Sequence, residues 1–134
     1  MSTRSQIGFY RTNEQSFDTP DVLIYKHSDG YPEGVIPLLK DFCKMFKERR
    51  GLDDTEYAGA WYVYELIDEH VNHMKAFKKE TGYSNIPDDG KDCLGHGIVK
   101  GFQWDIDYYY RVHPNTIEVY EMPERKLIDT ITIE

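Results

Sequence analysis

The stretch that decides the fold class is the alternating segment Phe102-Gln-Trp-Asp-Ile-Asp-Tyr-Tyr-Tyr-Arg-Val112. Apolar or aromatic residues alternate with polar ones, which is the period of a β-strand with one buried face. Turn-forming residues follow at 113–116 and again at 123–126, so the segment predicts the first strand of a three-stranded antiparallel meander ending near Ile133. The residues expected on its buried face are Phe102, Trp104, Ile106, Tyr108, Tyr110 and Val112.

Two helical patterns precede this segment. Apolar residues recur at three- and four-residue steps from Val35 to Phe46, and Arg49-Arg50-Gly51 is a typical helix end with cations and a glycine cap. A second helix is expected to begin at 53–56, where Asp53 and Glu56 have capping-box spacing. Its predicted buried seam is Ala60, Val63, Ile67, His70, Met74 and Phe77, with Leu66 and Val71 beside it and with His70 as a hydrogen-bonded core histidine.

The N-terminal part of the chain predicts two further strands. Residues 7–10, where Ile7 and Phe9 alternate with Gly8 and Tyr10, predict a weak strand, and 22–27 predict a β-branched one that we expect to pair antiparallel with it. The element order β-β-α-α-β-β-β predicts a single α+β domain over residues 1–134. It consists of a mostly antiparallel sheet of about five strands with two helices packed on one face. The glycine-rich connection 79–101 is long for a compact domain and is expected to hold at most a short strand near 97–100.

Composition excludes several classes of protein. The 134 residues carry a net charge of −8, and only residues 35–50 are basic, so nucleic acid is disfavoured as a partner. No apolar run is long enough to span a membrane, and the first residues lack the apolar core of a signal peptide. We therefore expect a cytoplasmic protein in which Cys43 and Cys93 are reduced.

The densest group of polar and turn-forming residues is the stretch from His27 to Gly34. His27, Asp29 and Tyr31 are candidate binding residues, because an imidazole and a carboxylate two positions apart can hold a ligand or a metal, or transfer protons. Turn chemistry explains the same residues: Asp29 closes an Asx turn, Gly30 supplies positive φ, and Pro32 keeps its neighbour extended.

The segment His27-x-Asp-Gly-Tyr-Pro32, a helix after it, and the later pattern Asp-x-x-Tyr-x-Tyr at 105–110 occur together in this chain. In these features the chain resembles a set of small proteins from phage, prophage and archaeal genomes. The resemblance spans about residues 21–121. It implies a protein associated with mobile elements and implies no particular chemistry.

The remaining candidates lie on the second helix and on the C-terminal strands. Glu69, His70 and His73 have neither the order nor the spacing of the zincin motif, so no metal site is predicted there. Asp105, Asp107 and Tyr109 are expected on the polar face of the alternating strand, where they form an acidic and aromatic docking surface.

Catalytic signatures are missing, which favours a non-enzymatic module that binds another protein or itself, with no cofactor and no metal. One alternative is a hydrolase or ligand-binding protein that uses His27, Asp29 and Tyr31, with His96 added from the glycine-rich connection. A weaker alternative is an acidic mimic of DNA.

Overall fold

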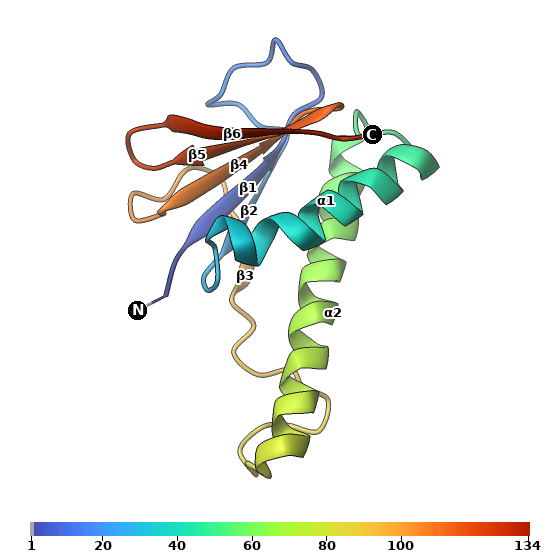
Figure 1. Cartoon of the computed structure of the whole chain (residues 1–134), viewed down its shortest axis with the longest axis vertical. Helices are drawn as coiled ribbons and strands as arrows, with labels where there is room; N and C mark the ends of the chain where they lie inside the picture. The colour runs from blue at the N-terminus through green and yellow to red at the C-terminus, as the bar shows by residue number, and fades with distance from the viewer. Residues whose placement is uncertain (1) are drawn as a thin grey trace.

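A computed structural model describes residues 2–134 and shows one sheet and two helices (Figure 1). The strands are β1 (Ser5–Phe9), β2 (Val22–Lys26), β3 (His96–Ile98), β4 (Tyr108–Val112), β5 (Thr116–Glu121) and β6 (Lys126–Thr132), and the helices are α1 (Pro32–Arg49) and α2 (Thr55–Thr81). Across the sheet the strand order is β3-β2-β1-β4-β5-β6. The β1–β4 pair is parallel and all other neighbours are antiparallel.

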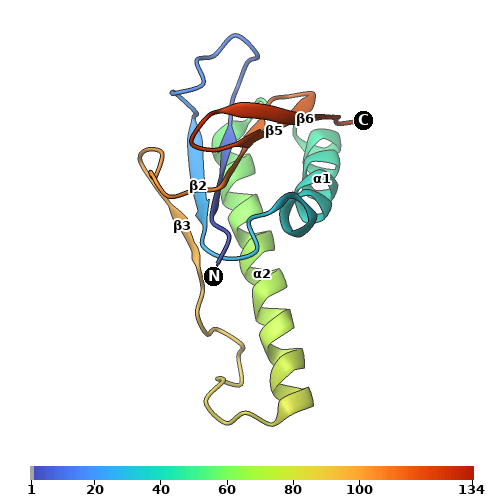
Figure 2. The ribbon, with the colours of Figure 1, turned by 60° about the vertical axis from the view of Figure 1, so that its left-hand side comes forward.

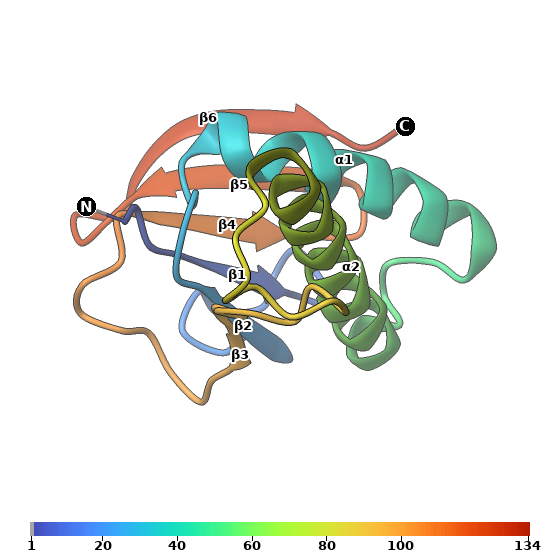
Figure 3. The same ribbon diagram turned by 90° about the horizontal axis from the view of Figure 1, so that it is seen from below.

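The α+β class is therefore confirmed, with six strands rather than five. The additional strand is β3, the short segment expected within the glycine-rich connection, and it extends the sheet beyond β2. The C-terminal meander and the antiparallel β1–β2 pair have the expected arrangement. Both helices lie on the same side of the sheet (Figures 2 and 3).

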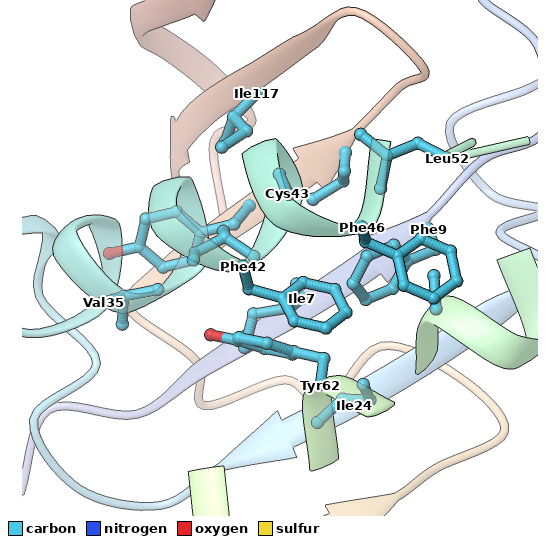
Figure 4. Close-up of a cluster of buried hydrophobic side chains, with 14 of the residues drawn as sticks. Ile7, Phe9, Ile24, Val35, Phe42, Cys43, Phe46, Leu52, Tyr62 and Ile117 are labelled. Atoms are coloured by element: carbon cyan, nitrogen blue, oxygen red, sulfur yellow. The ribbon is translucent and has the colours of Figure 1, made fainter. Parts of the chain in front are cut away.

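The face of the sheet under the helices, called the helix face, holds the main hydrophobic core (Figure 4). Ile7 and Phe9 of β1 are fully buried there against Phe42 and Tyr62. α1 contributes residues at the predicted helical spacing, because its apolar stripe has nowhere else to be buried. The buried α1 residues are Val35, Leu39, Phe42, Cys43 and Phe46.

The helix ends and the seam of α2 differ in part from prediction. Gly51 has φ 95° after α1, as expected for a glycine after a helix end. The Asp53–Glu56 capping box is wrong: Asp54 is the N-cap residue of α2, and its carboxylate instead pairs with Arg50. The buried seam is Thr55, Ala58, Gly59, Tyr62 and Leu66, so the predicted seam lies about one position away, with Ala60 and Phe77 exposed.

The C-terminal half of α2 extends past the sheet, and the chain returns beside it through residues 82–95 (Figures 1 and 2). Lys78 pairs with Asp88 at 2.6 Å along this return. A Cβ on Gly90 would lie 2.5 Å from the Val71 carbonyl oxygen, so the two segments are in close contact. His70 Nε2 lies 2.6 Å from the Asp92 carbonyl oxygen, so His70 is hydrogen-bonded as predicted but only half-buried.

The opposite face of the sheet, called the loop face, is covered by residues 10–21 and 99–107, so it is not open to solvent. Tyr109 is fully buried there, so its expected exposure is wrong. The strand predicted over 102–112 begins only at Tyr108, and Trp104 upstream of it is 89% exposed. The aromatic and apolar residues of this second core are Tyr10, Leu23, Ile106, Tyr109 and Tyr120, with Phe17, Tyr25, Val99, Phe102 and Met122 packed against them.

Both cysteines are free, with Cys43 buried in α1 and Cys93 exposed. Within residues 2–134, no helix combines the length and the apolar character needed to cross a membrane.

Candidate functional site

The loop from His27 to Gly34 is shaped by close backbone contacts. A Cβ on Gly30 would lie 2.7 Å from Ser5 Oγ, and the Gly30 carbonyl accepts a 2.6 Å hydrogen bond from Tyr110. A Cβ on Gly34 would lie 2.4 Å from the Asp29 carbonyl oxygen. The residue with positive φ is Asp29, at 54°, and not Gly30 as predicted. These two glycines are therefore required for close approach of the backbone.

Beside this loop, a hollow of about 180 Å³ opens between α2 and the strands β2 and β3. Lys26 and His96 are register partners on β2 and β3, and they point to the helix face, where α2 crosses the edge of the sheet. The lining residues are Lys26, Asp29, Leu66, Glu69, His70, His73 and His96. Five titratable side chains from α2, β2 and β3 and one from the His27–Gly34 loop therefore lie around the same hollow.

Lys26 is the least exposed charged group of this hollow. The residue is 8% exposed, yet no carboxylate lies within ion-pair distance of its ammonium in the described part of the chain. Burial lowers the pKa of Lys26, while the more distant charges of Glu69 and Asp29 oppose that shift. Burying an ammonium without a partner is costly, so this position is not explained by stability.

His96 is the second unusual group. Burial, together with Lys26 and His70, lowers its pKa to about 4, so the ring is neutral at physiological pH. Its Nδ1 atom is buried and finds no hydrogen-bond partner among residues 2–134. The rings of His70 and His96 lie 6.2 Å apart in an edge-to-face arrangement. A ring nitrogen without a partner next to an unpaired ammonium indicates a site with free hydrogen-bonding capacity.

The tautomer of His70 follows from its partner. The Asp92 carbonyl can only accept, so a neutral His70 donates its Nε2–H to it and leaves Nδ1 as an acceptor. The return segment 82–95 thus orients one ring of the hollow. A backbone carbonyl that fixes an imidazole in this way is common around functional histidines.

The structure brings together only part of the predicted site. Asp29 and His96 line the same hollow, whereas His27 and Tyr31 do not. His27 is exposed, and its Nδ1 lies 3.0 Å from the Tyr25 hydroxyl. Tyr31 is 40% exposed and is the extended residue before α1, with φ −70° and ψ 159°, as Pro32 was expected to impose.

The second predicted surface is not a site of exposed aromatics. Asp105 pairs with Arg4 at 2.5 Å, and Asp107 accepts a 3.2 Å hydrogen bond from the Arg4 backbone N–H. Tyr109 lies beneath the loops, with its hydroxyl 2.5 Å from that of Tyr10. Covering loops, and not a partner, therefore bury this aromatic surface.

Sequence reasoning left five lining residues out of the candidate site: Lys26, Leu66, Glu69, His70 and His73. One signal was available, because His70 and His73 are three positions apart and so share one face of α2. No signal pointed to Lys26, which reads as the polar end of a strand. Its importance depends on β3 returning next to β2.

The described residues contain no group of three or more His, Cys, Asp and Glu side chains that could hold a metal ion. Comparison with known proteins adds no assignment: no family model, no curated protein and no solved structure matches this chain.

Proposed function

We propose that this protein binds a small anion of low charge, such as a carboxylate or a singly ionised phosphate, in the hollow between α2, β2 and β3. The observation that carries the proposal is the buried and unpaired Lys26 beside His96, whose Nδ1 lacks a partner. An anion would complete both groups at once through charge-assisted hydrogen bonds.

The carboxylates at the site set the charge of the ligand. Asp29 and Glu69 line the same hollow and interact with Lys26 at longer range. Each would repel a bound anion, and a doubly charged ligand would experience this repulsion twice as strongly as a singly charged one. The site therefore suits a ligand with one negative charge. Such a ligand should also carry hydroxyl or N–H groups that donate hydrogen bonds to the two carboxylates.

The histidines make binding dependent on pH. A bound anion favours imidazolium, so it raises the pKa of His96 from about 4. By linkage, binding strengthens as the pH falls through the raised pKa of His96 toward 4. Inorganic phosphate at pH 6 is a suitable probe because its monoanion predominates there, and we expect a dissociation constant on the order of 1 mM.

The test is a phosphate titration followed by NMR of the five histidine rings. The signals of His70, His73 and His96 should shift, and His96 should titrate at higher pH, whereas His27 and His113, which lie outside the hollow, serve as internal controls. Equal shifts at all five rings, or no shift at His96, would refute the proposal.

Three variants sharpen the test. Lys26→Met keeps the shape of the side chain and should abolish phosphate binding, with Lys126→Met on exposed β6 as the matched control. Glu69→Gln should tighten binding, because it removes a repulsive charge. Lys26→Met should also leave stability unchanged or raise it, since the cost of burying the ammonium disappears. A folded Lys26→Met protein with unchanged phosphate affinity would contradict the assignment.

The unfolding free energy provides an independent check on His96. Its folded pKa of about 4 lies below the ordinary value of 6.5, so the unfolded state binds more protons between these values. The contribution of neutral His96 is complete above pH 6.5 and is lost as the pH falls toward 4. The free energy of unfolding of His96→Asn should therefore depend less on pH between 4 and 6.5 than that of the wild-type chain. Saturating phosphate should reduce the same pH dependence in the wild-type chain.

A further inference from the structure

Away from the hollow, α2 presents an exposed aromatic stripe. Tyr57, Trp61 and Tyr64 follow each other at four- and three-residue steps and are 54%, 38% and 64% exposed. Trp61 and Tyr64 line a hollow with Met45 of α1, which is half-buried, and Tyr57 lies beneath the guanidinium of Arg50 at the end of α1. Contiguous aromatic surface of this kind is uncommon on a protein that remains alone in solution.

Two adjoining hollows follow the junction of α1 and α2. One of about 370 Å³ is lined by Met45, Arg49, Ala60, Trp61, Tyr64 and Glu65. The other, of about 210 Å³, is lined by Leu38, Asp41, Phe42, Met45 and Glu65. They share Met45 and Glu65, so they adjoin each other, and together they are called here the α1–α2 groove.

Two residues of opposite charge lie along the α1 side of the groove, one on each side of Met45. Asp41, Met45 and Arg49 are spaced four residues apart on α1, which places them on one stripe with opposite charges about 12 Å apart. Neither Asp41 nor Arg49 takes part in a salt bridge within residues 2–134. Met45 lies midway between them.

We propose that the occupant of the α1–α2 groove is a second copy of this chain, related by a twofold axis that passes near Met45. A twofold axis pairs the residue at position 45 − n with that at 45 + n of the partner. Asp41 of each copy therefore faces Arg49 of the other, and the aromatic side chains of α2 flank the two contacts. This self-complementarity is what an isologous interface requires. The charges at equal distances from Met45 are opposite in sign, so a second copy in this orientation matches them without any further requirement.

The dimer is independent of the anion site, because the α1–α2 groove and the hollow of Lys26 share no residue. Failure of either proposal therefore leaves the other intact. We expect the wild-type chain to dimerise with a dissociation constant on the order of 1–10 μM, as measured by sedimentation equilibrium.

Charge reversal tests the geometry. Arg49→Glu and Asp41→Arg each place like charges opposite one another, so each variant alone should dimerise at least ~10-fold more weakly. Mixing the two variants should restore a dimer, because every contact in the mixed pair again joins opposite charges. Lys40→Glu, an exposed reversal on α1 outside the stripe, is the matched control and should leave dimerisation unchanged.

A second variant tests the aromatic part of the interface. Tyr64→Ser removes the most exposed ring of the stripe and should weaken the dimer while leaving the monomer folded. The proposal is overturned if the wild-type chain stays monomeric up to about 100 μM, far above the expected dissociation constant. It is also overturned if the mixture of charge variants dimerises no better than its components, since a groove that serves an unrelated partner gives that result.

Discussion

The helix face of the sheet is buried under α1 and α2, whereas the loop face is buried under residues 10–21 and 99–107. The two coverings differ in what they demand of the sheet. Helices satisfy their own backbone groups, so the strands beneath them need few hydrogen-bond donors and present mostly apolar side chains. Loops leave carbonyls unpaired, and the strands beneath them must supply donors.

The loop face supplies these donors from three side chains of β1, β4 and the residue after β1. The Tyr10 hydroxyl donates to the Phe17 carbonyl at 2.6 Å, and Arg111 Nη2 donates to the Gln15 carbonyl at 2.6 Å. Gln6 is fully buried and uses both ends of its amide, donating to Gly101 and accepting from the Gln103 backbone N–H. Polar residues on this face are therefore structural parts of a second core.

The largest expected effect is the loss of a large side chain from the helix face. Phe9→Ala should lower the free energy of unfolding by about 3–5 kcal/mol, because Phe9 is fully buried and no loop movement can refill the cavity. Phe17→Ala on the loop face should cost about half as much, since its ring is only half-buried and the loop can relax. Urea unfolding measures both values.

Hydrogen exchange then separates the two faces. Phe17→Ala should accelerate amide exchange in residues 10–21 and leave α1 unchanged, because the loop opens locally. Phe9→Ala should accelerate exchange throughout the chain. Equal costs and identical exchange patterns would show that the two coverings unfold as one unit.

The second effect concerns the glycine beneath the loop face. A Cβ on Gly8 would lie 1.8 Å from the Tyr109 hydroxyl and 2.9 Å from its ring, so Gly8→Ala must displace a buried phenol. We expect a loss of about 1–3 kcal/mol in urea unfolding. Gly97→Ala in β3 is the control, because a Cβ there meets no atom of residues 2–134 within 4 Å, and it should stay within about 0.5 kcal/mol of wild type. Similar costs for both would mean that Tyr109 does not need the space above Gly8.

Local patterns in the sequence predicted structure well, whereas features that depend on a distant partner were not predictable. The α1 stripe was predictable because helical periodicity is a local property. The alternation over 102–107 is equally clear and yet forms no strand, because strand length depends on a partner: β1 begins at Ser5, opposite Tyr108. Upstream of Ser5, Arg4 holds the segment through Asp105 instead.

The seam of α2 and the candidate site failed for related reasons. Gly59 of α2 lies close against the sheet, because a Cβ there would lie 2.6 Å from Val22. A buried seam predicted from the spacing of large apolar residues does not include a glycine such as Gly59. For the site, Asp29 and His96 were recognisable as residue types, but Lys26 acquires its meaning only from pairing with His96 across β2 and β3.

The third prediction compares one buried phenol on each face. Tyr10→Phe should cost about 1–2 kcal/mol, because it leaves the Phe17 carbonyl and the Tyr109 hydroxyl short of a partner. Tyr62→Phe on the helix face should be neutral or stabilising, since the Tyr62 hydroxyl is buried without a partner in the described part of the chain. Thermal unfolding of both variants tests this, and a larger loss for Tyr62→Phe would reverse the interpretation of the two faces.

This pair also carries a pH dependence. Burial raises the pKa of Tyr10 to about 12 from its ordinary value of 10, so the neutral phenol favours the folded state. Its contribution is complete below pH 10 and is lost as the pH rises through 12. Tyr10→Phe should therefore reduce the steepness with which stability declines between pH 10 and 12, and a decline as steep as that of wild type would contradict this origin.

The smallest effect is expected at the rim of the loop face, where Arg4 and Asp105 attach residues 102–107 to β1. Their side chains are 37% and 26% exposed, so water and salt screen the pair. Asp105→Asn should cost less than about 1 kcal/mol at low ionic strength, and the difference from wild type should disappear near 1 M salt, where the screening length is about 3 Å. Asp129→Asn on β6, exposed and outside every ion pair of residues 2–134, is the control. A cost that persists in high salt would show that Asp105 acts as a buried hydrogen-bonding group, which would make the rim of the loop face part of its core.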